Sequence, residues 1–123
     1  MGDRDGGVTK RLYHNGEWTK AKFTAWMKNI LRRGSYRWPP RYEALKAAKV
    51  ERGVYMCRGY KKRAHRVAYR DIQIDHIMPV VDPATGHTTW DKYINRLYCE
   101  VSNLQVLCKP CHKLKSKEER KKL

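Results

Sequence analysis

Acidic residues are scarce in this sequence. Its 123 residues include only 12 Asp and Glu against 28 Lys and Arg, which gives a net charge of +16. Such an excess of positive charge repels itself in a compact chain and favours a polyanionic partner. Solubility alone is the alternative explanation. Because Trp and Tyr are interleaved with the charges along the chain, we favour a nucleic-acid partner.

Long apolar runs are also missing. No run approaches the roughly 20 residues that span a bilayer, and the N-terminal residues lack the apolar segment of a secretory signal. Met1 and Gly2 are not followed by a second anchoring signal, so we expect no lipid anchor. These absences predict an intracellular protein that does not act at a membrane.

In a reducing compartment its four cysteines are not expected to form disulfides, and a Cys-x-x-Cys beside a His favours metal binding.

The length suits one domain, and the hydrophobic pattern predicts a small α+β fold. Residues 1–18 form a predicted flexible segment, because they show no period up to about residue 10. Residues 19–123 form the predicted domain. It begins with a helix from the N-cap Thr19 to Gly34. After the rigid connector Trp38-Pro39-Pro40, a second helix is expected over 40–50.

Short apolar runs predict strands at 54–57 and 64–69, on either side of a basic loop, and further strands at 72–77 and 104–107. Between the last two strands, Thr88 or Thr89 caps a predicted helix over 90–97. The final predicted helix begins near Pro110 and runs toward Arg120.

Residues suited to phosphodiester chemistry gather around the last two predicted strands. Asp75 and His76 end one strand, Asn103 precedes the next, and His112 opens the final helix. Hard divalent cations take oxygen or imidazole ligands, and imidazole titrates near neutral pH. Neighbouring strand residues face opposite ways. Asp75 and His76 can therefore share a site only if the strand ends there, which Pro79 favours.

These residues carry a family resemblance. The run Asp75-His76-Ile77-x-Pro79, followed by Asn103-Leu104-x-x-Leu107-Cys108-x-x-Cys111-His112-x-x-Lys115, strongly resembles the HNH (His-Asn-His) endonucleases, including phage, bacterial and homing-type members. The match covers about residues 72–118. It implies a ββα-metal finger preceded by two N-terminal helices. It also implies a metal-dependent enzyme that nicks or cuts duplex DNA and leaves 5′-phosphate and 3′-hydroxyl ends.

The resemblance also implies roles for single residues. His76 is expected to act as the general base on water, while Asp75 and His112 hold Mg²⁺ or Mn²⁺. Asn103 braces the loop and orients His76. Lys115 contacts phosphate, or else is an ordinary solvated helix charge. The implied setting is the cytoplasm of a bacterial or phage-infected cell, in homing or packaging, for a monomer or homodimer with DNA as partner.

Many HNH proteins bind a structural zinc through two Cys-x-x-Cys pairs. Cys108 and Cys111 match the second pair, and Cys57 matches the first position of the other, but Tyr60 stands where its partner should be. A tetrahedral zinc site takes four ligands. His65 or Cys99 remains as the fourth. Alternatively, no zinc binds and the cysteines are small core residues.

The phosphate-binding residues are expected in two basic segments, 20–41 and 58–70, together with the final helix. No dedicated base-reading motif is present, so we expect weak sequence specificity. The alternative function is a non-catalytic nucleic-acid-binding module with a zinc-finger-like core. The residues predicted to contact nucleic acid are Arg32, Arg33, Arg37, Arg41, Lys61, Lys62, Arg63 and Lys115.

Overall fold

The computed structural model describes residues 4–5, 8–9 and 11–121, and it divides into two compact units, one ending at Tyr36 and the other beginning at Arg37. The predicted flexible segment 1–18 lies partly outside the described residues, and its flexibility stays a prediction. Two short antiparallel hairpins fall within that segment and the residue after it. They pair β1 (Arg4–Asp5) with β2 (Val8–Thr9), and β3 (Arg11–Tyr13) with β4 (Trp18–Thr19).

The first unit contains the helix α1 (Lys20–Ser35). The hydroxyl of Thr19 accepts a hydrogen bond from the Lys22 amide at 3.1 Å, which confirms the predicted N-cap. Aromatic rings join the helix to the β3–β4 hairpin. The Tyr13 ring stacks on that of Phe23 with centroids 4.2 Å apart, and Trp18 meets Trp26 edge-on at 5.6 Å. These contacts hold the hairpin against the first turns of α1.

The second unit begins with α2 (Pro39–Ala48), which has proline in its first turn as predicted. The residue before it, Trp38, is extended, because the proline ring that follows disfavours helical backbone there. The Trp38 indole donates to the Cys99 carbonyl at 2.6 Å, and its ring meets Tyr98 edge-on at 5.5 Å. The start of α2 is thereby fixed to a segment that lies 61 residues further along the chain.

A three-stranded antiparallel sheet follows α2, in the order β5 (Lys49–Glu51), β6 (Val54–Cys57) and β7 (His65–Ala68). The strand β5 was not predicted. The expected helix over 40–50 stops at Ala48 because Lys49 and Glu51 pair with β6 across a turn at Gly53, which has a φ of +78°. Pairing of β6 with β7 sets Cys57 opposite His65.

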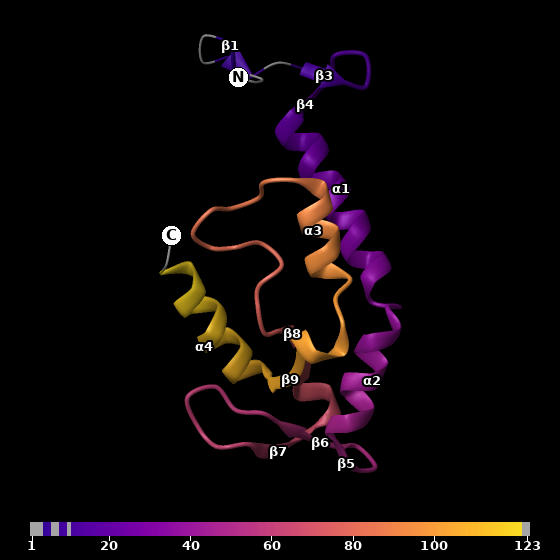
Figure 1. The fold of residues 1–123 in the computed structure, drawn as a ribbon, viewed down its shortest axis with the longest axis vertical. Helices are drawn as coiled ribbons and strands as arrows, with labels where there is room; N and C mark the ends of the chain where they lie inside the picture. The colour runs from indigo at the N-terminus through magenta and orange to yellow at the C-terminus, as the bar shows by residue number, and fades with distance from the viewer. Residues whose placement is uncertain (1–3, 6–7, 10, 122–123) are drawn as a thin grey trace. The chain divides into compact units, whose positions relative to one another are not determined.

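The second sheet is a two-stranded antiparallel ladder of β8 (Ile72–His76) and β9 (Leu104–Cys108). Short 3₁₀ turns, η1 (Tyr69–Asp71) and η2 (Val101–Asn103), precede its two strands. Between the strands lie a long loop and α3 (Trp90–Leu97), whose N-cap is Thr89. The helix α4 (Lys109–Arg120) leaves directly from β9 (Figure 1).

The core of the second unit is centred on β9. Four of its five side chains are buried, and α2, β6, β8 and α4 all pack against it. The described residues thus form an α+β fold, as predicted. None of the helices in the described part of the chain combines the length and the apolar character needed to cross a membrane.

Candidate functional site

Asp75 is one of three polar residues whose side chains are buried in the described part of the chain. Its register partner on β9 is Gln105, and the Gln105 amide donates to one carboxylate oxygen at 2.9 Å. The other oxygen lies 3.5 Å from Nε2 of His112, in the first turn of α4. The structure therefore brings Asp75 and His112 together from a strand and a helix 37 residues apart in sequence.

His76, the last residue of β8, is held differently. Its Nε2 lies 3.0 Å from the carbonyl oxygen of Leu97, at the end of α3. A carbonyl oxygen only accepts hydrogen bonds, so Nε2 carries the proton of the neutral ring. The lone pair then lies on Nδ1, which is the atom that can take a proton from a water molecule.

Asn103 braces the chain immediately after His76. Its backbone carbonyl accepts from the Ile77 amide at 2.8 Å, and its side-chain oxygen accepts from the Met78 amide at 2.9 Å. Its side-chain amide also donates to the Met78 carbonyl at 3.3 Å. These bonds turn the chain directly after His76, the residue at which β8 ends. Asn103 acts on His76 only through this turn, because both of its side-chain hydrogen bonds are to the backbone of Met78.

Of the two expectations for Lys115, the structure contradicts the solvated helix charge. Its side chain is 9% exposed, so it is not a solvated helix charge. Its ammonium lies 3.2 Å from the Asp75 carboxylate and 2.5 Å from that of Glu119, and it donates to the His76 carbonyl at 3.1 Å. Burial alone would lower the pKa of Lys115, but these two carboxylates outweigh it and raise that pKa. Its predicted contact with phosphate stays a prediction.

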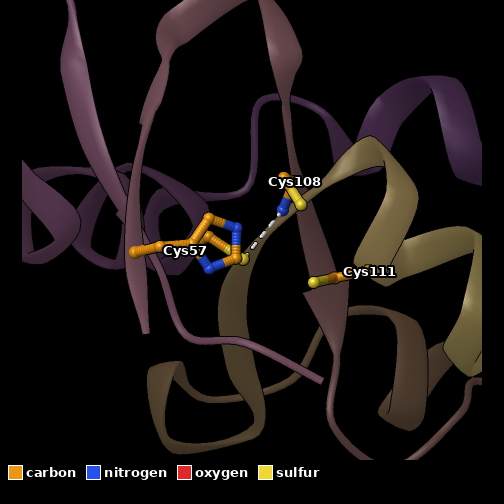
Figure 2. A group of neighbouring side chains, drawn as sticks. Cys57, Cys108 and Cys111 are labelled. Atoms are coloured by element: carbon orange, nitrogen blue, oxygen red, sulfur yellow. Dashed lines mark hydrogen bonds between the residues drawn. The ribbon is translucent and has the colours of Figure 1, made fainter. Parts of the chain in front are cut away.

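A second group of side chains gathers where β9 leads into α4, with members from β6, β7, β9 and α4. The possible ligand atoms of Cys57, His65, Cys108 and Cys111 all lie within 4.8 Å of one another. The three cysteines are buried and their sulfur atoms face a common space (Figure 2). Of the two candidates for a fourth ligand, the structure places His65 in this group. The pairing of β6 with β7 explains this, since it sets His65 opposite Cys57.

Backbone amides surround the sulfur of Cys57. The amides of Gly59 and Cys108 donate to it at 3.3 and 3.1 Å, the second of which is drawn in Figure 2. Burial raises the pKa of the Cys57 thiol to about 11, although these two bonds act to lower it. Burial also acts to raise the pKa of Cys111, but the Tyr60 amide, the neighbouring thiols and the charge of Lys62 together lower it.

The imidazole of His65 is oriented by the loop between β6 and β7. Its Nδ1 lies 3.0 Å from the carbonyl oxygen of Arg63. Since the carbonyl only accepts, Nδ1 is protonated in the neutral ring, and Nε2 has the lone pair that a metal requires. Three cysteines and one histidine are a ligand set of the kind found in tetrahedral zinc sites. This Cys₃His cluster could therefore bind a metal such as zinc.

The predicted nucleic-acid contacts fall in both units. Arg32 and Arg33 are exposed in the last turn of α1, in the first unit. The rest belong to the second unit, where Lys61, Lys62 and Arg63 are exposed in the β6–β7 loop. In that loop, Lys61 also pairs with Glu118 of α4 at 2.6 Å. The others in this unit are Arg37, Arg41 and the buried Lys115.

Sequence reasoning missed Gln105, which binds the Asp75 carboxylate. A signal for it exists, because Gln105 is the one polar residue in the run from Leu104 to Cys108.

The chain matches no protein family, no curated protein and no solved structure in the three comparisons made with known proteins.

Proposed function

We propose that the protein is a metal-dependent endonuclease of the HNH type that hydrolyses phosphodiester bonds in DNA. The observation that carries the proposal is the 3.5 Å approach of the Asp75 carboxylate to His112 Nε2. Neighbouring ligands of an octahedral Mg²⁺, at 2.0–2.1 Å from the ion, are about 3 Å apart. The two side chains need only a small adjustment to share one cation.

Each residue of the site has a task in this reaction. When bound by Asp75 and His112, the divalent cation supplies charge neutralisation for the phosphate and the leaving oxygen. His76 Nδ1 takes the proton of the attacking water. The Leu97 carbonyl, 3.0 Å from His76 Nε2, keeps the ring oriented and stabilises the imidazolium that results. Asn103 fixes the turn that positions His76.

The Cys₃His cluster is part of the same proposal, as a structural zinc site. Ligands of a tetrahedral zinc are about 3.4–3.8 Å apart, so ligand atoms within 4.8 Å need to contract only modestly. Bound there, zinc would join the β6–β7 hairpin to β9 and α4, which carry Gln105 and His112 beside Asp75.

One observation favours a second candidate, a non-catalytic nucleic-acid-binding module with a zinc-finger-like core. The ammonium of Lys115 lies 3.2 Å from the Asp75 carboxylate. A carboxylate satisfied by lysine and glutamine can be a structural ion pair instead of a metal ligand. In that case His76 and His112 have no catalytic role.

A plasmid-cleavage assay separates the two candidates. Wild type, His76→Ala and the control His14→Ala, an exposed turn residue, are incubated with supercoiled plasmid in Mg²⁺, Mn²⁺ or EDTA. The endonuclease is expected to nick or linearise the plasmid only with metal. His76→Ala should lose at least 100-fold in rate, the smaller end of what a general base contributes. A mobility shift without cleavage by any variant would support the binding module.

A further inference from the structure

Arg96 lies beside the catalytic candidates but has no place in the function proposed so far. It is on α3, directly before Leu97, whose carbonyl holds His76. Arg96 lines a cavity of about 360 Å³ that is also bordered by Ile77, Met78 and Lys115. Ile77 and Met78 follow His76 in the chain, so this cavity adjoins the candidate catalytic residues.

A second cavity, of about 190 Å³, also has Arg96 in its lining. It is lined by Thr88 and Thr89 before α3 and by Lys92 within the helix. Lys92 and Arg96 are four residues apart, which places them one turn apart on the same face of α3. Two cationic side chains on one helix face therefore border the pair of cavities.

Two of the three acidic residues that line these cavities have cationic partners. Glu118 pairs with Lys61 at 2.6 Å and accepts from the Tyr60 hydroxyl at 3.0 Å, and Glu119 pairs with Lys115 at 2.5 Å. Asp82, which borders both cavities, accepts from the Ala84 amide at 2.8 Å.

Arg96 is only partly exposed, yet within residues 11–121 it forms no ion pair with an acidic side chain. Its positive charge is therefore available to a ligand. A partly buried guanidinium beside an open cavity suits a phosphate, which it can bind through two parallel hydrogen bonds.

We propose that Arg96, assisted by Lys92, binds a backbone phosphate of the nucleic acid in this pair of cavities, adjacent to the phosphodiester held at Asp75, His76 and His112. The inference rests on the DNA-binding part of the proposed function. It assigns α3 two tasks, since the same helix end holds His76 through Leu97 and the substrate backbone through Arg96.

Equilibrium binding of a fluorescein-labelled DNA duplex tests this without cleavage. Binding is measured at 50 and 200 mM KCl, without added divalent ions, for wild type, Arg96→Gln, Arg96→Lys and Arg52→Gln. The control Arg52 is exposed in the turn between β5 and β6. Loss of one phosphate contact lowers the salt slope by about 0.9. Over this fourfold change in salt, wild-type affinity should fall about 3.5-fold more than that of Arg96→Gln.

Arg96→Lys should keep most of the salt slope, and Arg52→Gln should match wild type. A second measurement avoids substitution: the Arg96 Nε–Hε resonance of the wild type should shift when the same duplex is added, but not when KCl is added. An Arg96→Gln protein with the wild-type slope, an unmoved resonance, or a wild type that does not bind the duplex would overturn the inference. Plasmid cleavage reports on catalysis separately, so either conclusion can fail alone.

Discussion

Replacing Gly59 by alanine tests the geometry of the loop that follows Cys57. Gly59 has a φ of +84°, which L side chains rarely adopt. A Cβ at this position would lie 2.7 Å from the Arg63 carbonyl oxygen and even closer to that of Lys62. Both contacts are with backbone, so neither can be relieved by moving a flexible side chain. The loop itself must shift.

A matched control is present in the same unit. Gly53 has nearly the same φ, +78°, but a Cβ there would meet nothing within 4 Å. Both alanine variants bear the cost of left-handed backbone, about 1–2 kcal/mol. Only Gly59→Ala adds the close contacts, and overpacking of this kind typically costs about 1–3 kcal/mol more. The difference in unfolding free energy between the two variants therefore measures the cost of the close contacts at residue 59.

Thermal unfolding followed by circular dichroism measures this difference. In a domain of this size, 1 kcal/mol shifts Tm by about 4–8 °C. Gly59→Ala should therefore melt at least about 4 °C below Gly53→Ala. Its bound zinc should also fall, because the Arg63 carbonyl that orients His65 at 3.0 Å has to move. Equal melting temperatures for the two variants would refute the close approach of this loop to itself.

Two further predictions concern the ligands themselves. Cys57→Ser should lower Tm and release zinc, as measured by elemental analysis. The control Cys99→Ser, which lies outside the cluster, should do neither. Wild-type protein without zinc would end the zinc hypothesis. Asp75→Ala should reduce metal-dependent cleavage by weakening metal affinity, so that a titration of Mn²⁺ restores part of the rate. Cleavage that never required a divalent ion would contradict the whole catalytic site.

Local signals gave most of the secondary structure. Thr19 caps α1 as predicted, Thr89 is the one of the two predicted candidates that caps α3, and proline lies in the first turn of α2. The strand predicted at 72–77 agrees with β8 to within one residue. These features depend on neighbours within a few positions, so the sequence is sufficient to find them.

Features set by distant partners could not be found in this way. The preference for His65 over Cys99 in the cysteine cluster follows from the register of β6 and β7. Burial of Lys115 depends on carboxylates supplied by Asp75 and Glu119. A run of lysines in a helix normally predicts a solvated face, because an unpaired buried ammonium is very costly. Only the fold reveals that this one has partners.

The cysteine cluster has a consequence for chain entropy. Cys57 and Cys108 are 51 residues apart, so a metal ion between them would close a loop that contains Asp75, His76 and Asn103. By analogy with a disulfide, closing a loop of this length removes about 4 kcal/mol of conformational freedom from the unfolded chain. The ion would thus favour assembly of the catalytic candidates, although it touches none of the three. Its loss would act on them through the unfolded state.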